Sequence, residues 1–439
     1  MNKPIKIKDK KIGILGAGKS GLAAAELAFS LGAKVFISDS QKTKKLKNKF
    51  IEYEFGTHSK KILDSDLIIK SPGISSKIKI LDSIKKLKIP IFSEIEFASW
   101  FTKSFIIGLT GTNGKTTTIE LINHILKDNK KNVLKGGNIG IPFSKNIIEE
   151  KSIKLGNKKQ EIIHLLELSS FQLENIKYFK PNISIILNLS PDHLDRYLNY
   201  NEYVKTKLNI IMNQDSNCTA IINKKNTIIP KINKFQLIRF EITDCKKMIV
   251  NNKSIKINYN NISFKGSHNN ENILAAYIAS KKMGIKHNEI IKSINSFQSL
   301  DHRIEKINLK SDINYYNDSK ATNLNASIAA IESIEKDIIL ILGGIDKNNT
   351  DFTFLKRYSN KIKFIIIYGK SKDYIKKQIS MFFEIYVFND FKESVIKSIE
   401  LSRPHLSVLL SPSCASFDQF DNYIERGNYF KKIILNHYG

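Results

Sequence analysis

The residues best placed to do chemistry are those of the segment Gly111–Thr117, which reads Gly-Thr-Asn-Gly-Lys-Thr-Thr. The apolar run Phe105–Leu109 before it predicts a buried strand, and the segment after it has apolar residues at helical spacing. Glycines let backbone N–H groups turn toward an anion, and the N-terminus of the following helix favours negative charge. In such a loop Lys115 would reach the terminal phosphates of a nucleotide and Thr116 would bind Mg²⁺. The segment therefore predicts a site for ATP or GTP.

This loop departs from the usual phosphate-binding pattern at one position. The pattern has a glycine five residues before Gly114, where this chain has Leu109. The loop is therefore a shortened variant, and the alternative interpretation is an ordinary Gly-Lys turn. The predicted strand before the loop and the predicted helix after it favour the phosphate-binding interpretation.

A second glycine-rich turn, Gly16–Gly21, follows the first predicted strand and begins an alanine-rich helix. Asp39 ends the next predicted strand. This arrangement is typical of dinucleotide binding. The same turn can hold any pyrophosphate, including that of a UDP-sugar with Asp39 near the base or ribose. It can also serve only the close packing of strand and helix, so the glycines alone leave three interpretations open.

Two further polar groups follow apolar strands. Glu167 ends one strand, and its carboxylate can complete a Mg²⁺ shell begun by Thr116, although a glutamate at a strand end is usually just solvated. His193 lies in the polar segment Asn188–Arg196, which follows another strand. It can bind a second metal or an anion, or it can be an ordinary loop or core residue.

The elements that position these residues alternate between strand and helix patterns, which predicts an α/β protein with mostly parallel sheets. A chain of 439 residues has room for about three domains. In open α/β sheets, ligands bind beyond the carboxyl ends of strands, where the chemically interesting residues of this chain lie. The stretch 223–265 is poorly patterned and predicts short strands and loops. Strands are predicted near residues 11–16, 33–38, 66–70, 105–109, 162–168, 183–189, 337–342, 363–368, 384–388 and 406–411.

The net charge of +28 is high enough to suggest a nucleic-acid partner. Lysine, isoleucine and asparagine are abundant in every segment, however, so the charge indicates a compositional bias rather than one basic patch. The three cysteines, Cys218, Cys245 and Cys414, lack metal-like spacing and suit a reducing cytoplasm. No apolar run approaches the ~20 residues of a membrane span. We therefore expect a cytoplasmic protein with no nucleic-acid or membrane partner.

Several motifs in the right order resemble the Mur ligases, which are ATP-dependent amino-acid ligases of peptidoglycan precursor synthesis. Three C-terminal motifs resemble the D-glutamate-adding branch, because the other members usually carry an Asp-Tyr-Ala-type motif where this chain has Asp-Ser-Lys-Ala-Thr. The resemblance covers essentially the whole chain, from Gly16 to Asn428. It is carried by the segments Gly111–Thr117, Gly136–Gly140, Glu167–Gln172, Asn188–Arg196, Asn317–Asn323, Gly343–Lys347 and Ser411–Phe420.

This resemblance implies three domains: a Rossmann-like domain at 1–98 for UDP-N-acetylmuramoyl-L-alanine, a central P-loop ATPase domain at 99–301, and a Rossmann-like domain at 302–439 for D-glutamate. It implies ATP, two Mg²⁺ ions and a carbamylated lysine, and we expect a monomer. The implied contacts of the UDP-substrate are Ser20, Asp39, Ser40, Ser71 and Asn138. Those of ATP are Gly111, Thr112, Asn113, Gly114, Lys115, Thr116, Thr117, Asn269, Asn272, Arg303 and Asp318. Those of D-glutamate are Thr322, Lys347, Ser416 and Tyr423. The implied metal ligands are Thr116, Glu167, His193 and Lys207, and the implied catalytic residues are Lys115, His193 and Lys207.

Two of these implied positions have a specific weakness. Lys207 matches the lysine that the family carbamylates, in the motif Tyr203–Leu208, but Lys205 is the alternative if the register is shifted by two. The family often has phenylalanine where this chain has Tyr423. Lys320 is close in sequence to the same pocket and would serve either the glutamate or a phosphate.

Three other functions remain as alternatives. A folate-type polyglutamate ligase shares the phosphate loop but lacks the glycine turn Gly16–Gly21 and the Ser-Pro-Gly motif at Ser71. A nicotinamide oxidoreductase would explain Gly16–Gly21 but not Gly111–Thr117. A nucleic-acid-binding NTPase would explain the charge, yet the sequence lacks the aromatic and basic stacking platform that such proteins use.

Overall fold

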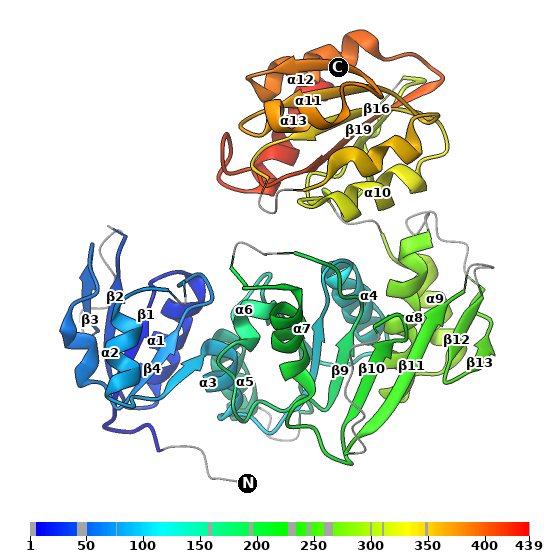
Figure 1. Cartoon of the computed structure of the whole chain (residues 1–439). Helices are drawn as coiled ribbons and strands as arrows, with labels where there is room; N and C mark the ends of the chain where they lie inside the picture. Colours follow the sequence, from blue (N-terminus) through cyan, green and yellow to red (C-terminus); the bar gives the residue numbers. More distant parts are fainter. Residues whose placement is uncertain are drawn as a thin grey trace. The chain divides into compact units, whose positions relative to one another are not determined.

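The computed structural model contains three β-sheets in two compact units (Figure 1). The first unit comprises Met1–Ser190, Asn199–Asn258 and Glu271–Ile294, and the second comprises Pro191–Leu198, Tyr259–Asn270 and Asn295–Gly439. The structure describes the chain except for residues 1–5, 42–50, 76, 157–159, 193–195, 227–233, 244–246, 259–266, 299–300, 310, 347–349 and 439, and the side chains of residues 267 and 268.

The first sheet has the strand order β3-β2-β1-β4-β5, and all of its neighbouring strands are parallel. Its central strands are rich in isoleucine and buried, as expected for a parallel sheet covered on both faces. The helix α1 packs its alanine-rich face against the sheet, which brings the glycine turn close to β1. The elements are β1 (Lys11–Leu15), α1 (Lys19–Ser30), β2 (Lys34–Asp39), β3 (Glu52–Phe55), the 3-10 helix η1 (Lys60–Asp64), β4 (Leu67–Lys70), α2 (Ile80–Lys86) and β5 (Ile91–Ser93).

The second sheet has the order β13-β12-β11-β10-β9-β6-β8-β7 and belongs to the same unit. The strands from β11 to β7 are parallel, and β12 and β13 form an antiparallel edge. The strands are β6 (Phe105–Thr110), β7 (Val133–Gly137), β8 (Ile163–Glu167), β9 (Ile183–Ile186), β10 (Thr219–Asn223), β11 (Gln236–Ile242), β12 (Met248–Val250) and β13 (Lys253–Ile255). The helices are α3 (Glu94–Ser99), α4 (Lys115–Asp128), α5 (Phe143–Gly156), α6 (Ser170–Leu173), α7 (Tyr200–Leu208), η2 (Asn209–Ile211), α8 (Ser267–Lys282) and α9 (His287–Ser296).

A buried glutamate joins the first two sheets. Glu96 of α3 accepts hydrogen bonds from the backbone N–H groups of Lys177, Tyr178 and Phe179, at 2.8–3.0 Å, and from Nε1 of Trp100 at 2.7 Å. A carboxylate held by several N–H donors is strongly stabilised. Since one apolar core also runs from the first sheet into the second, the two sheets form a single compact unit.

The third sheet has the order β14-β15-β19-β16-β17-β18, parallel except for β14. Side chains of β16 alternate between two apolar cores: Ile338 and Leu340 face the core with α10 and α11, and Ile339 faces the core with α12 and α13. The elements are β14 (Glu305–Lys306), β15 (Asn314–Asn317), α10 (Leu324–Ser333), β16 (Asp337–Gly343), η4 (Phe352–Tyr358), β17 (Ile362–Tyr368), α11 (Lys372–Ile379), β18 (Glu384–Phe388), α12 (Phe391–Leu401), β19 (Leu406–Ser413) and α13 (Tyr423–Tyr438).

The predicted α/β class is confirmed, and each strand range predicted from the sequence overlaps a strand of the structure. The sequence analysis gave no strand range for β3, β5, β7, β10, β14 and β15. Of these, β7 and β15 carry polar residues or glycines and so lack a continuous apolar run. In the stretch 223–265, the described residues form β11, β12 and β13, as short strands were expected there. Across the described residues, the helices are all too short or too polar to traverse a lipid bilayer.

Candidate active site

The phosphate loop connects β6 to α4, as the sequence predicts. Gly114 precedes α4 with φ of +78°, a left-handed conformation that favours glycine. A Cβ atom on Gly114 would also lie 2.2 Å from Oδ1 of Asn272, a residue of α8 that also accepts a hydrogen bond from Thr118 at 3.2 Å. The side chain of Lys115 bends back over the loop, and its Nζ donates to the carbonyl of Gly111 at 2.9 Å. The loop is therefore tightly packed, and the amine of its lysine is bonded to the loop's own backbone.

A neighbouring strand end fixes the shape of this loop. The backbone N–H of Thr112 donates to the carbonyl of Asn188 at 2.9 Å, and the N–H of Asn113 donates to Oδ1 of the same residue at 2.8 Å. The hydroxyl of Thr112 lies 3.1 Å from the hydroxyl of Tyr203 and bonds Ser190. The backbone N–H groups of Thr112 and Asn113 and the hydroxyl of Thr112 therefore hold the loop in shape. The sequence analysis assigned both residues to the nucleotide.

Oxygen ligands suited to Mg²⁺ meet beside the loop. Oγ1 of Thr116 donates to Oε2 of Glu167 at 2.7 Å, and Nδ2 of Asn138 donates to Oε1 at 3.0 Å. Glu167 is only 2% exposed. A hydroxyl and a carboxylate are ligands that Mg²⁺ prefers, so this pair fits the predicted cation. Among the described residues, His, Cys, Asp and Glu form no group of three or more that would hold a metal.

Two lysines share one carbonyl of the loop. Nζ of Lys207 donates to the Gly111 carbonyl at 2.8 Å, and Lys115 donates to the same oxygen. Lys207 is 2% exposed and its Nζ lies 4.8 Å from the ring centre of Tyr203, whereas Lys205 is exposed. The structure therefore places Lys207, and not Lys205, in the candidate site.

The other residues predicted around the nucleotide lie as follows. Thr117 is half-buried in the first turn of α4. Asn269 and Asn272 are buried in α8, one turn apart, and hence share one face of that helix. His193 lies outside the described residues.

Four of the residues predicted to bind the UDP-substrate lie at the carboxyl edge of the first sheet. Asp39 accepts hydrogen bonds from the N–H groups of Ala17 and Gln41, at 2.6 and 2.9 Å, and so orders the glycine turn. Oγ of Ser71 donates to the carbonyl of Gly16 at 3.0 Å. Ser20 is half-buried at the start of α1, and Ser40 is exposed after β2. The fifth residue, Asn138, lies on the second sheet against Glu167.

Arg303 and Asp318 lie together in the second unit. Asp318 follows β15, is 6% exposed, and accepts hydrogen bonds from Oγ of Ser411 at 2.8 Å and from the N–H of Ile304 at 3.3 Å. Burial raises the pKa of Asp318 to about 7, although the Ser411 hydroxyl and the charge of Arg303 act in the opposite direction. Arg303 and Asp318, both predicted to contact ATP, are therefore neighbours in the structure.

A second group of polar residues in this unit surrounds Tyr423. Nζ of Lys320 lies 3.9 Å from the ring centre of Tyr423, close enough for a cation–π interaction. Ser416 is buried in the turn after β19, and Thr322 is half-buried shortly before α10. Lys347 lies outside the described residues.

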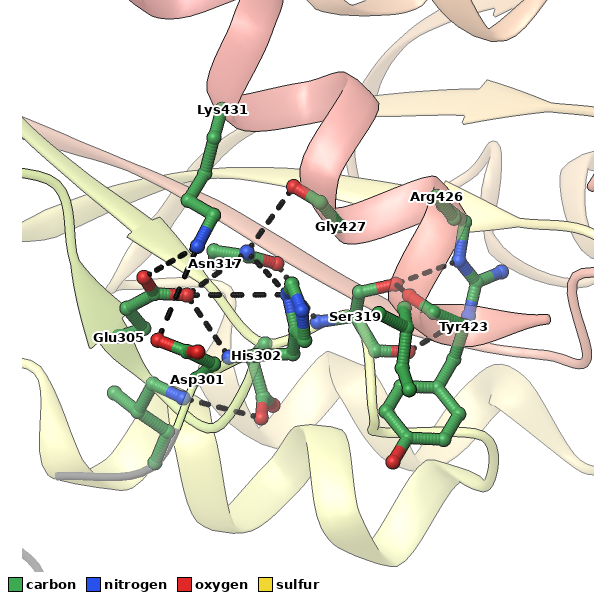
Figure 2. Close-up of polar contacts among 12 residues, drawn as sticks. Asp301, His302, Glu305, Asn317, Ser319, Tyr423, Arg426, Gly427 and Lys431 are labelled. Carbon is green, nitrogen blue, oxygen red and sulfur yellow. Dashed lines mark hydrogen bonds and ion pairs between the residues drawn. The ribbon is translucent and has the colours of Figure 1, made fainter.

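One residue of this region was missed by the sequence analysis. Arg426 is fully buried in α13 and donates to Oγ and the carbonyl of Ser319 (Figure 2). It also donates to the carbonyl of Cys414 and the hydroxyl of Tyr368. It therefore ties the loop after β15 to the loop after β19. The available signal was its position in Arg426-Gly427-Asn428, at the C-terminal end of the stretch that the resemblance covers.

A phosphate loop after β6 of one mainly parallel sheet, and an Arg–Asp pair on another, are typical of a nucleotide-using α/β enzyme. Residues 11–80 match the MurD N-terminal domain, residues 109–280 the Mur ligase middle domain, and residues 302–414 the glutamate ligase domain of Mur ligases. The chain belongs to the Mur ligase family.

Curated relatives agree with this assignment, and solved structures share the fold. A protein of Christiangramia forsetii and one of Elusimicrobium minutum, both named UDP-N-acetylmuramoylalanine–D-glutamate ligase, are each 39% identical to the chain; they cover 97% and 99% of it, with 99% of each relative matched. MurF ligase of Thermotoga maritima in complex with ADP shares the fold, with a TM-score of 0.61, 16% identity, and coverage of 98% of this chain and 96% of that one. MurC of the same organism gives a TM-score of 0.58 at 20% identity, with 98% and 99% covered.

Proposed function

We propose that this protein is an ATP-dependent ligase that joins D-glutamate to UDP-N-acetylmuramoyl-L-alanine. The observation that carries the proposal is the phosphate loop, where Lys115, Lys207 and the Thr116–Glu167 pair converge within one unit. The near-full-length relatives that bear this activity in their names support the choice of substrates.

The reaction follows from the chemistry of the groups that it joins. A free carboxylate is a poor acyl donor, so the L-alanyl carboxylate attacks the γ-phosphate of ATP and forms an acyl phosphate and ADP. The amine of D-glutamate then attacks the acyl carbon, and phosphate leaves. The site must hold several anions together and neutralise developing charge, a task suited to Lys115 and Arg303.

Thr116 and Glu167 supply the oxygen donors for one Mg²⁺, and we assign His193 and Lys207 to a second. When bound, Mg²⁺ neutralises phosphate charge. Glu167 is already oriented for this role, because Thr116 and Asn138 each bond one of its carboxylate oxygens.

Carbamylation of Lys207 is supported by the position of its amine. The ammonium groups of Lys115 and Lys207 bind the same carbonyl, so they lie within about 6 Å of each other and repel. Once the ammonium of Lys207 has lost a proton to solvent, its amine can add CO₂ and release a second proton. This replaces one cation by an anion and turns the repulsion into attraction. The resulting carbamate would also offer oxygen atoms to a cation.

The remaining residues are assigned by their places in the fold. Ser20, Asp39, Ser40, Ser71 and Asn138 are proposed to bind the UDP-substrate, with Asp39 acting by ordering the glycine turn. Asn269, Asn272, Arg303 and Asp318 are proposed to complete the nucleotide site. Thr322, Lys347, Ser416 and Tyr423 are proposed to bind the two carboxylates of D-glutamate, aided by Lys320. We further propose that the protein acts in the cytoplasm as a monomer.

The test is a phosphate-release assay with Mg²⁺, ATP and UDP-N-acetylmuramoyl-L-alanine against a panel of D- and L-amino acids, with mass spectrometry of the product. We expect release and a new amide with D-glutamate only. Release with folate substrates, or no amide with D-glutamate, would refute the proposal.

A further inference from the structure

Arg303 lies between two residues with left-handed backbone conformation. His302 has φ of +62° and Ile304 has φ of +49°. A β-branched residue rarely adopts such a conformation, which costs free energy and persists only where the surroundings enforce it. The turn Asp301–Ile304 is therefore held in place by its neighbours, and Arg303 is held with it.

Three backbone groups of this turn are bonded to residues beyond it. The N–H of His302 donates to Oε2 of Glu305 at 2.9 Å (Figure 2). The N–H of Ile304 donates to Oδ1 of Asp318 at 3.3 Å. The carbonyl of His302 accepts from the N–H of Lys320 at 3.2 Å. The residues on both sides of Arg303 are thus bonded to the loop that begins at Asp318.

The ring of His302 bonds the turn Asp301–Ile304 to its surroundings. It is 5% exposed, and its Nδ1 lies 2.9 Å from Nδ2 of Asn317, which also donates to the carbonyl of Gly427 at 3.2 Å. Nδ2 of an amide can only donate, so this contact is a hydrogen bond in the tautomer whose Nδ1 accepts. The ring also packs on α13, where a Cβ added to Gly427 would lie 2.3 Å from Nδ1.

Charged and aromatic groups face this ring from several elements. Glu305 of β14 lies 3.8 Å from Nδ1, and Lys431 of α13 binds Glu305 at 2.8 Å and lies 3.9 Å from Asp301. The ring of Tyr423 is edge-on to that of His302 at 6.2 Å. Burial and the charge of Lys431 lower the pKa of His302, in keeping with a neutral ring.

We propose that His302 is a positioning residue that sets Arg303 and the loop Asp318–Thr322 in one fixed arrangement, so that the nucleotide contact and the glutamate contact are formed together. This inference rests on the proposed function, which assigns Arg303 and Asp318 to ATP and Thr322 to D-glutamate. His302 itself touches neither substrate in this account. It acts through its ring contact with Asn317 and through its carbonyl contact with Lys320.

The test compares His302→Ala and His302→Asn with the wild type in steady-state kinetics for each of the three substrates. For His302→Ala we expect KM for both ATP and D-glutamate to rise about tenfold, because both contacts lose their common support. KM for the UDP-substrate should stay unchanged, because its proposed residues lie in the other unit. His302→Asn should recover part of the loss, since asparagine tolerates the left-handed conformation and offers an oxygen acceptor.

Two further variants sharpen the result. Gly427→Ala keeps every polar group and raises the helix propensity of α13, but its methyl group displaces the ring, so it should reproduce the same KM pattern. His405→Ala removes an exposed histidine of the same unit and should leave all three KM values unchanged.

The outcomes separate the inference from the proposed function. Wild-type turnover tests the function itself, and binding of a non-hydrolysable ATP analogue by calorimetry tests His302 even without turnover. Unchanged kinetics in His302→Ala, or equal rises in all three KM values, would overturn the inference. If His302→Ala does not fold, the same pattern must be found in His302→Asn and Gly427→Ala, and its absence there overturns the inference.

Discussion

The buried carboxyl group of Asp318 makes a prediction that separates stability from function. We expect Asp318→Asn to stabilise the second unit while weakening ATP binding at least tenfold. The variant can keep both hydrogen bonds, with its Oδ1 toward the N–H of Ile304 and its Nδ2 toward the hydroxyl of Ser411. What it loses is the capacity to carry a negative charge.

The magnitude follows from the two pKa values. Burial raises the pKa of Asp318 from the ordinary 3.8 to about 7, so the folded state binds the proton more tightly than the unfolded state. The stability that this group contributes is therefore present at low pH and is lost as pH rises from about 4 to about 7. At about 1.4 kcal/mol per pH unit, charging the group costs about 4 kcal/mol at pH 8 and about 2 kcal/mol at pH 5. The advantage of the neutral asparagine should thus grow by about 2–3 kcal/mol between these pH values.

Urea unfolding followed by circular dichroism, at pH 5 and pH 8, measures this advantage. Hydrogen exchange of β15 and β19 assigns the gain to the second unit. Asp421→Asn, at an exposed position of the same unit, is the matched control and should show no such pH dependence. A stability difference that is independent of pH, or a loss of stability at pH 8, would refute the reasoning.

Three further predictions concern the first unit. Gly114→Ala should lower turnover at least tenfold, because the new methyl group meets Asn272; turnover equal to that of the wild type would contradict this. Lys207→Ala should abolish turnover and Lys205→Ala should not, and the opposite result would show that the register is shifted by two. Glu96→Gln should destabilise this unit by about 2–3 kcal/mol in urea. The NH₂ group of glutamine would face backbone N–H groups that now donate to the carboxylate, so donor would meet donor. An unchanged unfolding midpoint would contradict this.

The sequence predicts those parts of the site that depend on local chain geometry. The loop Gly111–Thr117 needs only a strand before it and a helix after it, and both are visible as apolar patterns. The same is true of β16, whose residues are apolar on both faces because helices cover both faces of its sheet. For such segments, pattern and structure agree because the same few residues determine both.

Contacts between segments far apart in the chain cannot be predicted from such local sequence patterns. The spacing in the chain did not decide between Lys205 and Lys207, since only packing against the phosphate loop buries Lys207. The assignment of Asn138 to the UDP-substrate stays a prediction, and the sequence did not show that the pairing of β7 with β8 also brings Asn138 to Glu167. Arg426 was overlooked because its partner Ser319 lies more than a hundred residues earlier in the chain.

Buried charge alone does not mark the candidate site, and the contrast between two carboxyl groups shows what does. Glu96 is as buried as Asp318, but N–H donors surround its carboxylate, and it joins two sheets. A raised pKa is not sufficient either, because burial raises the pKa of Glu94, beside the N-terminus of α5, to about 7 as well. Asp318 combines burial and a raised pKa with a neighbouring Arg303 that is held by a strained turn. Backbone strain and a buried carboxyl group whose charge is incompletely compensated both reduce stability. A fold retains such a combination where function requires it.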